Sequence, residues 1–273
     1  GAVQEAPSPV LGVGLALPAP LDPTDGRPHR AILPAWTGLD PARTIEDAFE
    51  LPVRADNDAN LGALAELWWG AGRGARGLVF VKVATGIGAG ISVDGRIHSG
   101  THGLAGELGH LSVDSNGPPC MCGGNGCLNV LVGTQALLDR ARGRLPHFPQ
   151  SALQGGALDL SALIRATQAS DPLAMEIMGF AGSRLGEGLG NLLNVLDPEV
   201  LVVGGDLTQG GEALLRPLRR AVERRTLAEG RPNDRVVRSQ VDEQSVALGA
   251  ATAILRAALE SWELPLVGGG TST

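Results

Sequence analysis

All three cysteines of the chain lie in one short stretch, Cys120-Met-Cys-Gly-Gly-Asn-Gly-Cys127. Three thiols this close together on a Gly-rich turn are typical of a metal site, and zinc prefers four tetrahedral ligands. A fourth ligand with a suitable spacing is His110, ten residues upstream of Cys120. We therefore predict a closed, structural Zn²⁺ site formed by His110, Cys120, Cys122 and Cys127. A disulfide and free thiols are the alternatives, but a Cys-x-Cys pair makes a poor disulfide and an odd count leaves one thiol unpaired.

The composition is that of a globular protein with a sizeable core. The chain has 273 residues, of which 43% are hydrophobic, and this is enough for two lobes. No apolar run reaches the ~20 residues that a membrane span requires, and the N-terminal residues show no secretion signal. Metal-ready cysteines fit the reducing cytoplasm, where we expect the protein to be located. The net charge of −7 argues against nucleic-acid binding by this chain alone, because phosphate contacts need a basic surface.

Strand and helix patterns alternate along the chain, which is typical of an α/β fold. Short apolar runs predict strands, and amphipathic periodicity predicts helices between them. The expected strands cover residues 10–17, 51–55, 78–83, 91–93 and 200–203, and the expected helices cover residues 59–69, 180–196 and 245–259. Asp94-Gly95 is a hairpin signal, and the Pro/Gly/Gln-rich segment 145–158 is expected to be an exposed loop.

Four polar residues have the chemistry of a sugar site. Asn57 and Asp58 follow the strand 51–55, and ligand sites in α/β folds gather at strand ends. Asp58 can accept a hydrogen bond from a hydroxyl group or take its proton as a general base, although a lone Asp at this place is more often a helix cap. Glu107 adds a second carboxylate. His110 adds a ring nitrogen, which a metal on the other nitrogen would orient.

Two Gly-rich stretches allow a close approach of the backbone to a phosphate. The first contains Thr85, Gly86 and Gly88, and the second is Gly204-Gly205 after an apolar strand. Glycine lets the backbone come near a ligand, as it does in phosphate cradles. The first stretch is a weak signal, because glycine also serves plain hairpins, and a tight turn explains the second stretch as well as a nucleotide does.

The order of these motifs resembles that of the ROK proteins (repressor, open reading frame, kinase), which include bacterial glucokinases and sugar-responsive regulators. The segments that carry the resemblance are Gly12–Pro18, Asp56–Asn60, Thr85–Gly90, Gly106–His110, Cys120–Leu128 and Leu201–Gly205. The resemblance implies a two-lobed actin- or hexokinase-like fold, related to ribonuclease H, around a sugar cleft. It also implies that Asp58 is the base in kinase members and that zinc holds the loop presenting the sugar site. The sugar-binding residues would be Asn57, Asp58, Glu107 and His110.

The chain departs from the kinase pattern of this family in two places. It contains no Asp-x-Gly-Gly-Thr, the motif with which kinases of the family handle the ATP phosphates, so we expect the first strands of the small lobe to be missing. Asn129 stands where sugar kinases of the family typically have a sugar-binding Glu, and it is the fifth expected sugar-binding residue. The expected domains are an incomplete small lobe over residues 1–74, a large lobe with the zinc loop over 75–244, a helix 245–260 that returns to the small lobe, and a tail over 261–273.

The first functional hypothesis is the sugar-sensing effector domain of a ROK transcriptional regulator. A hexose or sugar derivative would bind in the cleft and change how a homodimer or tetramer presents DNA-binding segments that precede this chain. Asp58 would then be a hydrogen-bond acceptor. The alternative is an ATP- and Mg²⁺-dependent hexose kinase, in which Asp58 is the base and the two Gly-rich stretches hold the nucleotide. A third hypothesis is a fragment that keeps the zinc fold and binds no ligand.

Overall fold

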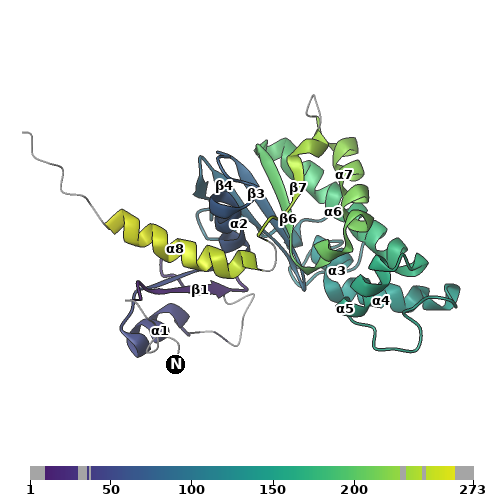
Figure 1. Cartoon of the computed structure of the whole chain (residues 1–273), viewed down its shortest axis with the longest axis horizontal. Helices are drawn as coiled ribbons and strands as arrows, with labels where there is room; N and C mark the ends of the chain where they lie inside the picture. The colour runs from purple at the N-terminus through teal and green to yellow at the C-terminus, as the bar shows by residue number, and fades with distance from the viewer. Residues whose placement is uncertain (1–9, 30–35, 37, 228–231, 242–243, 262–273) are drawn as a thin grey trace, which may run out of the picture.

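The computed structural model describes residues 10–29, 36, 38–227, 232–241 and 244–261, which form two β-sheets with helices around them (Figure 1). The small sheet pairs strand β1 (Val13–Leu17) in parallel with strand β2 (Val53–Asn57). The large sheet has the strand order β5-β4-β3-β6-β7. Its strands are β3 (Leu78–Val83), β4 (Ile87–Val93), β5 (Arg96–Ile97), β6 (Val200–Gly204) and β7 (Val236–Arg238). β3 runs parallel to β6 and antiparallel to β4. The predicted α/β class is confirmed.

Helices connect the strands and cover the sheets. They are α1 (Pro41–Phe49), α2 (Asp58–Trp69), α3 (Leu128–Val132), α4 (Thr134–Arg144), α5 (Leu160–Gln168), α6 (Pro172–Leu196), α7 (Glu212–Arg225) and α8 (Ser245–Ser261). Helix α6 begins well before the predicted residue 180, because the Asp171 side chain caps the backbone N–H groups of Leu173 and Ala174. Within the described residues, no helix combines the length and apolar character of a membrane span.

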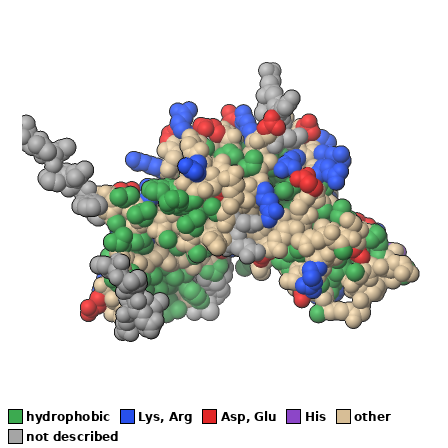
Figure 2. All heavy atoms as spheres, viewed as in Figure 1, with side chains coloured by type: hydrophobic (Ala, Val, Ile, Leu, Met, Phe, Trp, Pro, Cys, Tyr) green, Lys and Arg blue, Asp and Glu red, His purple; other side chains and the backbone are tan. Residues whose placement is uncertain are grey.

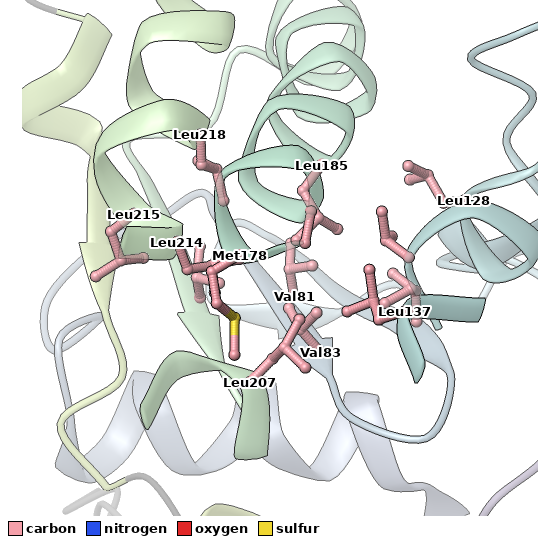
Figure 3. Close-up of a cluster of buried hydrophobic side chains, with 14 of the residues drawn as sticks. Val81, Val83, Leu128, Leu137, Met178, Leu185, Leu207, Leu214, Leu215 and Leu218 are labelled. Carbon is pink, nitrogen blue, oxygen red and sulfur yellow. The ribbon is translucent and has the colours of Figure 1, made fainter. Parts of the chain in front are cut away.

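Strand β3 separates two hydrophobic cores, because its side chains alternate between the two faces of the large sheet. Val81 and Val83 belong to a large buried cluster that includes side chains of α3, α4, α6 and α7 (Figure 3). Leu78 and Phe80 belong to a second cluster, in which they pack against Ala63 of α2. Helix α2 therefore covers one face of the large sheet, and α6 and α7 lie on the other face.

Helix α8 lies against both α2 and β1 (Figure 1). The contacts are close, since a Cβ atom on Gly14 of β1 would lie 2.2 Å from the carbonyl oxygen of Ala250. A Cβ atom on Gly249 would likewise lie 1.9 Å from the carbonyl oxygen of Leu61 in α2. Glycine is required at both positions because any side chain would push the backbones apart. Helices α2 and α8 thus join the small sheet to the large one. Residues 262–273 of the expected tail lie outside the described residues.

The expectation of an exposed loop over residues 145–158 is wrong for its middle part. Ser151 and Leu153 are buried. The Ser151 hydroxyl donates a hydrogen bond to Asp171 Oδ1 at 3.0 Å, at the position where Asp171 caps helix α6. The polar composition of the segment suggests exposure, but one of its polar residues, Ser151, is buried in a contact with the start of α6.

A buried carboxylate holds the two chain segments that connect the sheets. Glu66, in the last turn of α2, is completely buried. Its Oε2 accepts a hydrogen bond from the Ala71 N–H at 2.7 Å. Its Oε1 accepts from the Ser239 hydroxyl at 2.5 Å and from the Gln240 N–H at 3.2 Å. Ala71 follows α2 and Ser239 precedes α8, so Glu66 fixes both connections.

We expect Glu66→Ala to lower the free energy of unfolding by about 3 kcal/mol, because three backbone N–H groups and a hydroxyl lose their buried acceptor. Denaturant titration followed by circular dichroism measures this loss. Glu223→Ala, which changes an exposed glutamate on α7, is the matched control and should stay within about 0.5 kcal/mol of the wild type. Equal stability of Glu66→Ala and the wild type would show that the connections do not depend on this carboxylate.

Candidate functional site

A cleft with a volume of about 510 Å³ lies at the carboxyl ends of β2 and β3. Its lining comes from chain segments that are far apart in the sequence. All five residues that the sequence suggests for a sugar are among them: Asn57, Asp58, Glu107, His110 and Asn129. The fold therefore brings this set of carboxylate, amide and imidazole groups to one surface.

Helix α2 begins at this cleft. The Asn57 side chain caps the helix by accepting a hydrogen bond from the Ala59 N–H at 2.9 Å. The cap is therefore Asn57, and Asp58 is the first residue of the helix itself. A carboxylate in the first turn is stabilised by the positive end of the helix dipole. Asp58 consequently lines the cleft without being needed as the cap.

The Asp58 carboxylate forms an ion pair with Lys82 of β3. The distance between Lys82 Nζ and Asp58 Oδ2 is 2.5 Å. Of the two side chains, 28% of Lys82 and 19% of Asp58 remain exposed, so both reach the cleft. Lys82 does not stand out as a site residue in the sequence, because it lies in the apolar run 78–83. The available signal was in the composition, since Lys82 is the single lysine among the 22 basic residues of the chain.

Glu107 and His110 come from a segment that includes the short 3-10 helix η2 (Leu108–His110). Burial raises the pKa of Glu107 above its usual value. His110 opposes this rise, and the neighbouring Asp58 adds to it. Glu107 therefore holds a proton more strongly than an exposed glutamate, mainly because its carboxyl group is partly removed from water.

His110 also belongs to the predicted metal cluster. Its Nδ1 lies 3.4 Å from Cys120 Sγ, and the Sγ atoms of Cys122 and Cys127 are 3.6 Å apart. One ligand atom from each of these four residues can be chosen so that all lie within 4.8 Å of one another. Zinc with tetrahedral bonds of about 2.3 Å to sulfur would separate two sulfur atoms by about 3.8 Å. A disulfide needs about 2.05 Å, and the three cysteines form none. The four residues can therefore hold a metal ion.

The thiols of this cluster differ in their protonation. The backbone N–H of Gly124 and hydrogen bonds from the other two cysteines lower the pKa of Cys122 to about 7. Burial raises the pKa of Cys127 to about 12. Cys122 is exposed and Cys127 is buried. A metal ion would bind both as thiolates, so metal binding would release protons.

Asn129, in helix α3, holds the edge of the cleft. Its Oδ1 accepts a hydrogen bond from the N–H of Ile87, the first residue of β4, at 2.7 Å. Thr85 and Gly86 precede this point, line the cleft and are exposed. The amide oxygen of Asn129 is thus engaged with the backbone, and its side chain connects α3 to the turn between β3 and β4.

From residue 87 onward the first Gly-rich stretch is a strand, which corrects the expectation of a strand limited to residues 91–93. Gly88 and Gly90 lie in β4. A Cβ atom on Gly90 would lie 2.3 Å from the carbonyl oxygen of Ala59, so this glycine lets α2 approach the sheet. Packing accounts for Gly90 without a phosphate.

The second Gly-rich stretch lies apart from the cleft. Gly204 ends β6, and a Cβ atom there would lie 2.7 Å from the ring of Phe80. Gly205 has a φ of 94°, a backbone conformation that favours glycine. Neither residue is part of the cleft lining, whereas Thr85, Gly86 and Gly88 are.

A model of the ROK family matches residues 2–257 of the chain. The chain belongs to the ROK family. It is 34% identical over 222 residues to a glucokinase of Halalkalibacterium halodurans, an alignment that covers 79% of this chain and 67% of the relative. It is 30% identical over 253 residues to the DNA-binding transcriptional dual regulator NagC of Escherichia coli, covering 92% of this chain and 61% of NagC. The chain thus spans about two thirds of the length of these relatives.

The fold comparison agrees with the family. The structure of a ROK family glucokinase from Streptomyces griseus, in complex with glucose and AMPPNP, matches with a TM-score of 0.83 and 28% sequence identity. The match covers 94% of this chain and 84% of the glucokinase. Kinases and DNA-binding regulators are therefore both relatives of this ROK chain, so family membership alone does not choose between the two activities.

Next to the cleft, this ROK chain has a further, partly buried carboxyl group. Asp56 Oδ1 accepts hydrogen bonds from the Asn60 side chain at 2.8 Å and from the Asn57 N–H at 2.7 Å. Burial raises the pKa of Asp56, and these two hydrogen bonds oppose the rise. Asp56 therefore costs stability when it ionises in the folded state.

Asp56→Asn should remove a pH-dependent loss of stability. Because the pKa of Asp56 is raised in the folded state, the folded protein binds its proton more tightly than the unfolded chain does. Stability then falls as pH rises from the usual value of 3.8 through the raised one. The Asn side chain can keep both hydrogen bonds without a charge. We expect the melting temperature of the variant to be higher than that of the wild type at pH 7. The two melting temperatures should become similar near the usual carboxyl pKa.

The matched control for this comparison is Asp94→Asn, in the exposed turn between β4 and β5, and it should show no such trend. A melting temperature of Asp56→Asn that differs from the wild type by the same amount at every pH would contradict the explanation.

Proposed function

We propose that this chain is the sugar-sensing effector domain of a ROK transcriptional regulator. A hexose or a sugar derivative would bind in the cleft between the two sheets. Two carboxylates, two amides and an imidazole supply the acceptors and donors that several hydroxyl groups need. These groups belong to Asn57, Asp58, Glu107, His110 and Asn129. The relationship to NagC, whose alignment covers 92% of this chain, is compatible with a regulator, but the glucokinase structure covers 94% of the chain and does not separate the two.

The ion pair between Lys82 and Asp58 is the observation that carries this proposal. A general base needs a carboxylate oxygen with a lone pair directed at the proton it removes. Here one oxygen of Asp58 already accepts from an ammonium group at 2.5 Å. A charge-paired carboxylate can still accept a hydrogen bond from a hydroxyl group through its second oxygen. This arrangement favours recognition of a sugar over deprotonation of it.

The alternative is an ATP- and Mg²⁺-dependent hexose kinase. It is favoured by the position of Asp58 at the cleft and by the 34% identity to a glucokinase. Asp58 would then be the catalytic base. Thr85, Gly86 and Gly88 would hold the nucleotide from the cleft side, and Gly204 and Gly205 from the end of β6. An assay of phosphate transfer from ATP to a hexose in the presence of Mg²⁺ distinguishes the two functions. Transfer by the wild type that Asp58→Asn abolishes would replace our proposal with the kinase.

We further propose that the metal ion of the cluster is a structural Zn²⁺ bound by His110, Cys120, Cys122 and Cys127. Three thiolates and an imidazole are ligands that suit zinc, and four protein ligands leave no position for a substrate. His110 Nδ1 faces Cys120, so zinc on this atom would leave Nε2 for a ligand. The separation of 3.6 Å between the Sγ atoms of Cys122 and Cys127 supports this assignment.

Assembly into a homodimer or tetramer remains a prediction. Figure 2 shows hydrophobic side chains gathered over the part of the molecule formed by α1, β1 and α8. Exposed large hydrophobic residues in or next to these elements include Leu11, Phe49 and Leu259. Such gathered apolar surface is typical of protein contacts. In a regulator, a fixed arrangement of the subunits would present the DNA-binding segments. We expect such a regulator to act in the cytoplasm.

The sugar site is tested by Glu107→Ala. In the wild type, a sugar that binds should stabilise the fold by roughly 1.4 kcal/mol at about 10 times its Kd. We expect this stabilisation, measured as a shift in melting temperature with glucose, N-acetylglucosamine and xylose, to disappear in Glu107→Ala. Glu223→Ala should keep it. A full shift in Glu107→Ala would move the sugar site away from this cleft.

The zinc assignment is tested by metal analysis of the purified protein. We expect about one zinc per chain, and we expect Cys127→Ser to lose it, because Cys127 is buried inside the cluster. Chelation should lower the melting temperature, since zinc binding contributes to folding. Met121→Ala, which changes an exposed residue between two ligands, is the control and should retain the metal. Protein that is free of zinc and melts at the same temperature with or without chelator would remove the assignment.

A further inference from the structure

We propose that Lys82 is a ligand-contacting residue that, together with Asp58, grips one hydroxyl group of an uncharged sugar. The inference rests on the proposed sugar binding and adds a specificity-determining residue to it. Its starting point is composition: 21 of the 22 basic residues are arginine and one is lysine. The chain thus uses lysine only at the position where a basic group meets the cleft.

The fold gives Lys82 an open place on the sheet. In the register of the large sheet, Lys82 lies opposite Gly88 of β4 and opposite Gly204 of β6. Residues that lie opposite each other on adjacent strands point to the same face. Lys82 is therefore flanked by two glycines on the face that α2 covers. No neighbouring strand side chain competes for this space, so the lysine stem can extend to the start of α2, where Asp58 lies.

The hydrogen-bonding capacity of the pair is not used up. A lysine ammonium has three N–H donors, and among the described residues the one acceptor within hydrogen-bond distance of it is Asp58. The Asp58 carboxylate has a second oxygen, and both side chains line the cleft. Lys82 therefore has donors to offer a ligand, and Asp58 has an acceptor, within one hydrogen-bond length of each other.

A hydroxyl group matches this pair because it can donate and accept at the same time. It can donate its proton to Asp58 and accept from Lys82. A carboxylate of a ligand could only accept, and an ammonium could only donate. The charges of Lys82 and Asp58 offset each other, and Glu107 adds a further acidic group to the lining, so Lys82 brings no uncompensated positive charge for an anion. The geometry thus favours an uncharged sugar over a sugar phosphate.

The single lysine makes the contact directly observable. Protein grown on ¹³C,¹⁵N-lysine carries its label at Lys82 alone. We would titrate it with glucose, N-acetylglucosamine, xylose and glucose 6-phosphate, and measure binding of each by calorimetry in parallel. The expected result is a saturating shift of the Lys82 side-chain signals, with the Kd that calorimetry gives, for an uncharged sugar and with weaker binding of the phosphate. Heat of binding with unchanged Lys82 signals would overturn this inference while leaving the sugar site in place. Absence of binding by every probe would overturn both.

A set of variants tests the shared hydroxyl group. Lys82→Met keeps most of the side-chain length and removes the charge, and we expect it to weaken binding of the uncharged sugar about 10-fold or more. If Lys82 and Asp58 grip the same hydroxyl, the combined Lys82→Met and Asp58→Asn variant should lose less affinity than the product of the two single losses. Losses that simply multiply would show that the two side chains contact different groups.

Deoxy sugars separate a direct contact from a structural role. One monodeoxyglucose should bind the wild type more weakly than glucose does, and this difference should shrink in Lys82→Met, while the differences for the other deoxy sugars should not change. A uniform loss for all sugars would mean that Lys82 only shapes the cleft. Arg73→Met, which changes an exposed basic residue outside the cleft, is the matched control and should bind like the wild type.

Discussion

Helix α2 has to satisfy polar groups at both ends in largely buried surroundings, and the rest of the structure is arranged around this constraint. At its start, Asn57 caps the backbone and Asp58 pairs with Lys82. In its last turn, Glu66 accepts hydrogen bonds from both connections between the sheets. One end of helix α2 thus carries the candidate ligand site, and the other end carries the carboxylate that fixes the two connections between the sheets. A ligand held by Asp58 would act on the element that links the small sheet to the large one, which is what a sensor needs.

The segment that carries Glu107 and His110 is held in a different way. Hydrophobic packing holds α2, but the loop over residues 117–126 has few apolar side chains, and its Met121 is 78% exposed. Its order comes from backbone hydrogen bonds, such as that from the Cys120 N–H to the Gly124 carbonyl oxygen at 2.8 Å. A metal ion bound by the four ligands would stabilise this loop in place of a hydrophobic core, because the ion would connect residues that otherwise share little buried surface.

The parts of the fold that the sequence predicted are those in which one strong local pattern decides the outcome. Apolar runs gave the positions of β1, β3 and β6, and the cysteine spacing identified a cluster that the structure brings together. The misses occurred where the deciding contact is distant in the sequence. Helix α6 begins earlier than predicted because Asp171 caps it. Gly90 lies in a strand, and a glycine is needed there because α2 packs closely against it. Glycine allows a turn and a close packing contact alike, so its sequence pattern could not distinguish them.

Lys82 shows the same difficulty at the candidate site. Within an apolar strand, period-two alternation places it on one face, but the sequence does not reveal that α2 begins opposite that face with Asp58. The structure supplies this neighbour, and the neighbour changes the chemistry expected of the carboxylate. An aspartate at the end of a strand can be a base or an acceptor, and the two roles use the same atoms. What separates them is the charge placed beside the carboxylate: an ammonium 2.5 Å away keeps one oxygen occupied and offers its own donors to the ligand. This neighbour is the reason why we propose that the pair holds a hydroxyl group and does not ionise it.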